Sequence, residues 1–235
     1  MRYATVLFDV GETLLRVPEP APMYREVLAR CGRSLPIAEV ESILAQVRVT
    51  MDEQIPRWVR DDLTLDCDAS RRRRSLHVDT ILSLAGVADC TTARAVFFDL
   101  YVGTDFFTLY PDVPEALEQL RSAGCRLGIV SNWESRLPDL CAAHGIASYF
   151  DFAVVSELEG FVKPHPHMYR RALALAGAPA ERVAHLGDSL RDDVEGAAAL
   201  GIHGILVDRT GACSAEYQPR ISSLADLARI LDADR

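Results

Sequence analysis

The pattern of hydrophobic and polar residues divides the chain into two regions of different periodicity. From about Tyr110 onward, short apolar runs alternate with segments of helical period. The apolar runs predict strands at residues 126–131, 152–155, 183–187 and 203–207. The segments between and after them predict helices at residues 114–124, 134–144, 166–177, 190–200 and 222–231. Alternation of this kind is typical of a parallel sheet covered by helices on both faces, so we expect the α/β fold class.

The region before it has a different pattern. Residues 4–9 form one more apolar run, which we assign to the same sheet. Residues 17–105 then show helical periodicity without convincing strands, with helices expected at residues 22–32, 36–53, 70–86 and 91–103. We therefore predict a Rossmann-like core formed by residues 1–16 and 106–235, with an all-helical domain inserted at residues 17–105.

Charge and composition narrow the classes of partner. The net charge of −9, from 34 acidic and 25 basic residues, disfavours nucleic acid and anionic membranes. It is compatible with a small phosphorylated substrate, because a local lysine and a metal ion can outweigh the overall field. No apolar run approaches the roughly 20 residues needed to cross a bilayer, and no leader of the secretory type precedes the first strand. The six cysteines include no Cys-x-x-Cys pair. This favours reduced thiols and a cytoplasmic protein, whose oligomeric state the sequence does not indicate.

Polar residues follow the predicted strands at four stations along the chain. These stations are Asp9, Ser131 with Asn132, Lys163, and Asp188 with Asp192 and Asp193. In an open parallel sheet the carboxyl ends of the strands share one edge, and ligands bind there. Four polar stations at one edge are hard to explain by packing, so we expect a functional site.

The first two stations fit phosphate chemistry. The Asp9 carboxylate can attack phosphorus and form an aspartyl phosphate, which divides one difficult displacement into two easier ones. The alternative is that Asp9 caps a helix or a turn. The hydroxyl of Ser131 and the adjacent backbone N–H groups suit a phosphoryl oxygen, although serine also commonly caps helices.

The other two stations add a cation and a set of oxygen ligands. Lys163 is the chain's single lysine among 25 basic residues. A lysine beside a proline after a strand can place a point charge against a phosphate; the alternative is an ordinary exposed lysine. Asp188 with Asp193, preferred over Asp192, offers hard oxygen ligands that suit Mg²⁺. The alternative is helix capping and compensation of the helix dipole.

In this order and spacing, the four stations resemble the four motifs of the haloacid dehalogenase (HAD) superfamily. The first motif is Asp9…Thr13, and the last is Gly187-Asp188…Asp193, which is similar to phosphatase-type members. The segment 17–105 resembles the helical cap of subfamily I. The resemblance therefore covers the whole chain and implies the HAD fold.

The resemblance also implies a role for each site residue. Asp9 and Lys163 would be the catalytic residues. Substrate would be bound by Val10, Gly11, Ser131, Asn132 and Lys163. The cofactor would be Mg²⁺, held by Asp9, Asp188, Asp193 and the backbone carbonyl of Gly11.

The first motif departs from the family pattern at Gly11. Most HAD phosphatases carry a second Asp two residues after the first, where it protonates the leaving oxygen and later activates water. Gly11 keeps a backbone carbonyl but supplies no carboxyl, and positioned acid–base catalysis is typically worth about 10²–10⁴-fold. Glu12 is adjacent, but neighbouring side chains on an extended segment point apart. We therefore do not expect Glu12 to replace the missing acid.

Three functions follow from this pattern. The first is a Mg²⁺-dependent phosphatase that is slow or restricted to good leaving groups. The second is a 2-haloacid dehalogenase, whose halide needs no proton to leave; the retained Asp188 and Asp193 argue against it, as does Gly11-Glu12 in place of a Tyr-Gly pair. The third is a catalytically retired protein that binds a phosphorylated ligand or a protein partner.

The specificity of such a protein would depend on the helical domain. Two of its residues, Arg57 and Trp58, could project into the substrate cleft, or they could be a surface arginine and a packed indole.

Overall fold

The computed structural model describes residues 2–54, 62–87, 90–102, 106–214 and 216–227. The chain forms two compact units. The first combines Met1–Arg16, Asp61–Leu65 and Leu109–Arg235, and the second combines Val17–Arg60 and Asp66–Thr108. The sequence did not indicate that a short segment within the helical region belongs with the sheet-containing unit.

The first unit is built on a six-stranded sheet in the order β5-β4-β1-β6-β7-β8. The strands are β1 Thr5–Phe8, β4 Arg126–Ser131, β5 Phe152–Val155, β6 Val183–Gly187, β7 His203–Val207 and β8 Arg220–Ile221. All neighbouring strands are parallel, and β1 lies between β4 and β6. Every residue of β1 and β6 is buried, as expected for strands covered on both faces. The predicted Rossmann-like α/β fold is confirmed.

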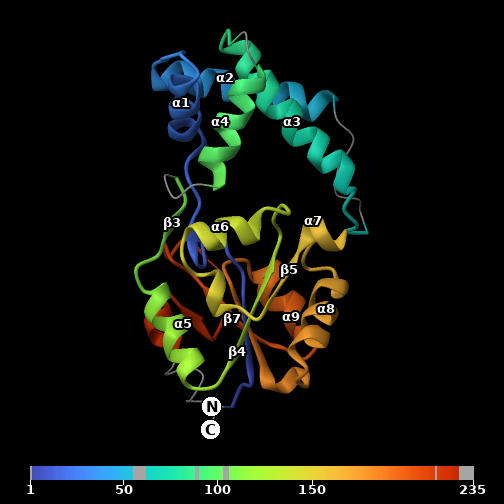
Figure 1. Ribbon diagram of the computed structural model, residues 1–235. Coiled ribbons are helices and arrows are strands. Elements are labelled where there is room, and N and C mark those ends of the chain that lie inside the picture. Colours follow the sequence, from blue (N-terminus) through green and yellow to red (C-terminus); the bar gives the residue numbers. More distant parts are fainter. Residues whose placement is uncertain (1, 55–61, 88–89, 103–105, 215, 228–235) are drawn as a thin grey trace. The chain divides into compact units, whose positions relative to one another are not determined.

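Helices flank this sheet, with α5 and α8 on opposite sides in Figure 1. The helices of the unit are α5 Val113–Ser122, α6 Leu137–Ala143, α7 Ser156–Glu159, α8 Pro166–Ala176 and α9 Gly196–Ala198. The 3₁₀ turns are η1 Ala147–Tyr149, η2 Ala180–Arg182 and η4 Leu224–Asp226, and η3 Leu190–Glu195 is a π-helical turn. A small separate sheet pairs β2 Leu15–Arg16 with β3 Thr108–Leu109. Met168 and Tyr169 of α8 are buried and pack in one cluster with Val130 and Val154 of the sheet.

In the first unit, three predicted helices differ clearly from the observed elements. Helix α6 begins at Leu137 rather than at residue 134, because Pro138 favours the first turn of a helix. The segment predicted as one helix at 190–200 is the π turn η3 followed by the short α9. The segment predicted as a closing helix at 222–231 shows the 3₁₀ turn η4, and its residues beyond 227 lie outside the described part.

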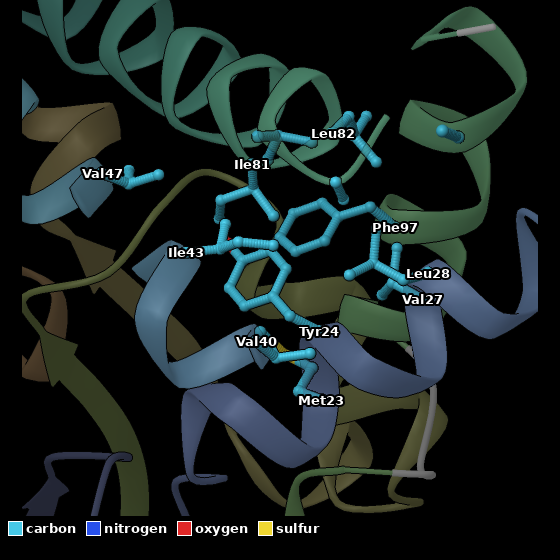
Figure 2. Packing of buried hydrophobic residues seen from close by; sticks show 13 residues of the cluster. Met23, Tyr24, Val27, Leu28, Val40, Ile43, Val47, Ile81, Leu82 and Phe97 are labelled. Carbon is cyan, nitrogen blue, oxygen red and sulfur yellow. The ribbon is translucent and has the colours of Figure 1, made fainter. Parts of the chain in front are cut away.

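The second unit contains four helices in its described residues. They are α1 Pro20–Arg30, α2 Ile37–Gln54, α3 Cys67–Leu84 and α4 Cys90–Val102. Figure 2 shows their shared apolar core, in which the Tyr24 and Phe97 rings stack at 5.5 Å between centroids. Helix α3 starts before the predicted residue 70 because Asp66 caps it, accepting from the Ala69 N–H at 2.8 Å. Arg57 and Trp58 lie outside the described residues.

Two properties expected from composition can be compared with the structure. In the part of the chain that is described, no helix is long and apolar enough to cross a bilayer. The cysteines described as free thiols are Cys31, Cys67, Cys125, Cys141 and Cys213.

Candidate active site

The carboxyl edge of the sheet brings the four polar stations together. Asp9 follows β1, Ser131 ends β4, and Asp188 follows β6. Lys163 enters from the loop between α7 and α8. Asp9 is 7% exposed, Lys163 4% and Asp193 1%. Charged groups this deeply buried must be paired or hydrogen-bonded, so their partners define the site.

Lys163 is the centre of the site. Its Nζ donates to Asp9 Oδ1 at 2.6 Å, to Asp193 Oδ1 at 2.5 Å and to the Val130 carbonyl at 2.9 Å. An ammonium has three N–H donors, and all three are used. Burial alone would lower the pKa of Lys163, but the charges of Asp193 and Asp9 raise it above its usual value. Lys163 is therefore a buried, permanently charged group, and the alternative of an ordinary exposed lysine was wrong.

Asn132 and Ser131 hold two other members of the site. The Asn132 side chain binds the backbone of Lys163 on both sides, accepting from its N–H at 2.6 Å and donating to its carbonyl at 3.1 Å. Ser131 Oγ donates to Asp9 Oδ1 at 2.9 Å. The following helix, α6, has Arg136 at its N-cap, so the capping alternative for Ser131 was wrong. Substrate binding by Ser131 and Asn132 stays a prediction.

Asp193 is fixed by three donors. Its Oδ1 accepts from Lys163 and lies 3.1 Å from His185 Nε2, and its Oδ2 accepts from the Ser189 N–H at 3.0 Å. Burial would raise the pKa of Asp193, but the Lys163 charge and the His185 hydrogen bond lower it to about 2. A Cβ atom at Gly187 would lie 2.1 Å from Asp193 Cγ. Only glycine at position 187 leaves room for this carboxylate.

Three carboxylates could hold a metal ion. Ligand oxygens of Asp9, Asp188 and Asp193 all lie within 4.8 Å of one another. Asp192 is outside this group; its N–H donates to Ser189 Oγ at 3.1 Å. Ser189 occupies the N-cap position of η3, so Asp188 does not cap that turn as the alternative proposed. Hard oxygen ligands of this kind fit Mg²⁺.

The charges of the site also fit a cation. One ammonium faces three carboxylates. Burial raises the pKa of Asp9 even though Lys163 opposes the shift. Partial desolvation and the charges of Asp9 and Asp193 raise the pKa of Asp188 to about 7. Asp188 is the one exposed member, so water screens part of this repulsion. A divalent cation would remove the excess negative charge.

This excess charge predicts how stabilisation by Mg²⁺ would depend on pH. A carboxyl whose pKa is raised by folding stabilises the folded state at low pH, and this contribution is lost as pH rises to the folded pKa. For Asp188 the window runs from about pH 4 to about 7. We expect Mg²⁺ to raise Tm more at pH 8 than at pH 5, measured by thermal unfolding. Asp188→Asn should flatten the difference, and an equal Mg²⁺ shift at both pH values in the wild type would contradict the assignment.

The loop after Asp9 has a different shape from the extended one assumed above. Val10 is buried, and its carbonyl accepts from the N–H groups of Leu14 and Leu15, both at 2.9 Å. Gly11 pairs with Leu15 in an isolated bridge. Glu12 has φ 51°, in the left-handed region. The premise that Glu12 lies on an extended segment was wrong. The roles of Val10 and Gly11 toward substrate and metal stay predictions.

Sequence reasoning assigned no role to two residues, one buried and one partly buried, that the structure connects to the site. His185 is fully buried on β6 and lies in hydrogen-bonding distance of Asp193. Its signal was present, since it is the one polar side chain in the strand Val183–Gly187. Arg209 contacts the carbonyl of Thr13 in the loop after Asp9. The two residues are 196 positions apart in the sequence, and no local pattern marks this contact.

The family of the chain follows from comparison with known sequences. Residues 3–201 match the haloacid dehalogenase-like hydrolases. This chain belongs to that family. The match spans all four stations of the carboxyl edge, so the resemblance inferred from the motifs is confirmed.

Relatives of this HAD-like hydrolase include a protein named for the same domain and a phosphatase. The "haloacid dehalogenase-like hydrolase domain-containing protein 3" of Mus musculus is 37% identical over 209 residues, covering 85% of this chain and 80% of the relative. A phosphoglycolate phosphatase of Pseudomonas syringae pv. syringae is 30% identical over 200 residues, covering 84% of this chain and 66% of the relative.

Solved structures with the same fold include both activities of the family. A 2-haloacid dehalogenase from Pseudomonas syringae pv. Tomato superposes with a TM-score of 0.68 at 25% identity, covering 99% of this chain and 100% of the other. A HAD phosphatase from Thermococcus onnurineus superposes with a TM-score of 0.65 at 23% identity, covering 97% of each chain. The fold is thus shared by phosphatases and dehalogenases, and the site must distinguish them.

Proposed function

We propose that this HAD-like hydrolase is a Mg²⁺-dependent phosphatase of small phosphorylated metabolites that is slow or restricted to good leaving groups. One observation carries the proposal. A buried ammonium, Lys163, bonds a carboxylate at the end of the central strand, while Asp9, Asp188 and Asp193 converge within 4.8 Å. A halide displacement needs no such metal-binding set. The similarity to proteins named phosphoserine and phosphoglycolate phosphatase supports the same choice.

The residues of the site would divide the reaction into two displacements. In the first, Asp9 attacks phosphorus; a bond forms between its carboxylate oxygen and phosphorus, and the bond to the leaving oxygen breaks with its electron pair. In the second, water displaces Asp9 and releases inorganic phosphate. Lys163 would hold a phosphoryl oxygen and orient Asp9. Mg²⁺ held by Asp9, Asp188, Asp193 and the Gly11 carbonyl would neutralise phosphate charge.

With Gly11, this site lacks the carboxyl that would protonate the leaving oxygen and later activate water. The residue at position 11 would supply the proton to the departing oxygen, and glycine has none to give. An aryl or acyl phosphate needs little protonation as it leaves, so its cleavage survives the loss. For an alkyl phosphate the missing acid costs up to about 10²–10⁴-fold in rate.

The test is hydrolysis of 4-nitrophenyl phosphate with Mg²⁺ and with excess chelator. We expect turnover that chelator and Asp188→Ala both abolish. Asp192→Ala is the matched control, because Asp192 lies outside the three-carboxylate group, and it should keep its turnover. Hydrolysis undiminished in chelator would contradict the Mg²⁺ dependence, and chloride release from 2-chloropropionate would identify a dehalogenase. Phosphate binding without any turnover would identify a retired protein.

Restoring a carboxyl at position 11 should extend the substrate range. We expect Gly11→Asp to raise turnover on alkyl phosphates by up to about 10²-fold if the new carboxyl reaches the leaving oxygen, with a smaller effect on aryl phosphates. Steady-state kinetics of the variant and the wild type on alkyl and aryl phosphates measure the gain in turnover for each substrate class. Gly11→Asn, which has the same shape and no acid, is the control. A folded Gly11→Asp protein whose crystal structure places the carboxyl at the phosphate site without a gain would contradict the missing-acid explanation.

A further inference from the structure

An arginine outside the four motifs contacts the loop that follows Asp9. Arg209 lies two residues beyond β7, and its side chain is only 6% exposed. Its Nε and Nη2 both donate to the carbonyl oxygen of Thr13, at 3.2 and 2.7 Å. The planar guanidinium aims two N–H groups from different nitrogens at the same carbonyl oxygen, whereas a lysine has only one nitrogen. Arg209 therefore fixes the backbone of the loop from outside it.

The same arginine supports the loop through an aromatic ring. The guanidinium carbon of Arg209 lies 4.2 Å from the centre of the Tyr110 ring, within the range of a cation–π contact. The Tyr110 hydroxyl donates to Glu12 Oε2 at 2.7 Å. The backbone N–H of Tyr110 donates to the carbonyl of Leu14 at 3.0 Å. Burial and the bond to Glu12 raise the pKa of Tyr110, so it remains a donor. Three consecutive loop residues, Glu12, Thr13 and Leu14, are thus bonded by Arg209 or by Tyr110.

Asp112 anchors Arg209 to the rest of the sheet-containing unit. Arg209 Nη1 donates to Asp112 Oδ2 at 2.6 Å. The same oxygen accepts from Ser223 Oγ at 2.5 Å and from the Leu224 N–H at 2.7 Å. Asp112 stands at the N-cap position of α5, but its side chain makes no capping bond to that helix. Its carboxylate orients the arginine instead.

The loop that Arg209 contacts also has hydrogen bonds of its own. Its amides bond within the loop: the Glu12 N–H donates to the Leu15 carbonyl at 2.7 Å, and the Leu14 N–H to the Val10 carbonyl at 2.9 Å. Gly11, at its tip, has no side chain to pack. These internal bonds fix the shape of the loop, and contacts from outside it add to what sets the position of the Gly11 carbonyl relative to Asp9.

We propose that Arg209 is a positioning residue that holds the loop Val10–Leu15, and with it the Gly11 carbonyl, in the arrangement that the metal requires. The expected effect on catalysis rests on the proposed function. The contact between Arg209 and the loop does not depend on that function. A group that only stabilises the fold would change the stability of the whole unit. A positioning group changes this loop, the Mg²⁺ affinity and turnover together.

The test uses Arg209→Lys, which keeps a cation beside Asp112 but loses the fork to Thr13. Three quantities are measured: amide hydrogen exchange of the peptide covering 10–15, the Mg²⁺ dissociation constant by calorimetry, and kcat and KM on 4-nitrophenyl phosphate. We expect about tenfold faster exchange and about tenfold weaker Mg²⁺ binding, the scale of losing a charge-assisted hydrogen bond. We also expect kcat to fall more than KM rises, while exchange in β4 stays unchanged.

Two further variants separate positioning from folding. Arg121→Lys is the matched control, because Arg121 pairs with Asp151 at 2.8 Å and lies outside the loop's contacts described above; it should leave all three quantities unchanged. Tyr110→Phe removes only the hydroxyl that binds Glu12, and should speed exchange in the loop without removing the ring from beneath Arg209.

The outcomes decide between the inferences. Unchanged loop exchange in folded Arg209→Lys and Tyr110→Phe would overturn the proposal. Faster exchange with unchanged Mg²⁺ affinity and kcat would also overturn it, because the loop would then be held without consequence for the site. A wild type that binds no Mg²⁺ and hydrolyses no phosphate would remove the proposed function, while loop exchange would still decide whether Arg209 holds the loop.

Discussion

Asp9→Asn should abolish phosphate hydrolysis and leave the protein folded. An amide oxygen is a poor nucleophile, so the aspartyl phosphate cannot form. The substitution keeps the shape of the side chain and an acceptor oxygen for Ser131 and Lys163, which bond Asp9 Oδ1 at 2.9 and 2.6 Å. We expect turnover on 4-nitrophenyl phosphate below about a hundredth of the wild-type value, given the losses seen when a covalent catalyst is removed.

Two controls make the Asp9 result interpretable. Asp192→Asn changes a neighbouring carboxyl of the same edge that lies outside the metal-binding group, and should retain turnover. Circular dichroism and thermal unfolding show whether the Asp9→Asn protein is folded. Turnover of the folded variant above that hundredth would exclude Asp9 as the nucleophile.

Lys163→Met should have the second largest effect, on both stability and activity. The variant leaves two buried carboxylates, Asp9 and Asp193, without their shared cation. Breaking a buried ion pair by removing one partner typically costs about 3–5 kcal/mol in the free energy of unfolding. Turnover and phosphate affinity should fall together, because the Lys163 charge acts on the phosphate in both the ground state and the transition state. Urea unfolding and calorimetry with inorganic phosphate measure the two effects.

The sequence itself provides a further check on Lys163. As the chain's single lysine, it gives one Nζ signal in a protein labelled with ¹⁵N-lysine. Its raised pKa predicts an ammonium that persists above the ordinary value of 10.5. A signal that titrates below that value would show that the two carboxylates are not its partners. Unchanged phosphate affinity in folded Lys163→Met would place Lys163 outside the phosphate site.

The features predictable from the sequence are those set by local pattern. Strands such as Val183–Gly187 are buried on both faces, so they read as continuous apolar runs, and parallel pairing then placed Asp9, Ser131 and Asp188 at one edge. Helix starts were less predictable, because proline at position 138 and the Asp66 cap override periodicity.

The features missed depend on contacts between distant segments or on backbone conformation. The left-handed φ of Glu12 turns its side chain to Tyr110, 98 residues away. The bond from Arg209 to Thr13 spans 196 residues. Neither leaves a periodic or compositional signal in the sequence. Only His185, a lone polar residue within a buried strand, could have been identified from the pattern.

The most direct measurement is the dependence of kcat/KM on leaving-group pKa, for a series of aryl and alkyl phosphates in Mg²⁺. A phosphatase that uses Asp9 without an acid at position 11 must expel each leaving group unprotonated. We therefore expect log kcat/KM to fall steeply as leaving-group pKa rises. The ratio of kcat/KM for alkyl phosphates to that for aryl phosphates should be lower than in most HAD phosphatases by about 10²-fold or more. A flat dependence, with alkyl and aryl phosphates cleaved at similar rates, would contradict a site that lacks its acid.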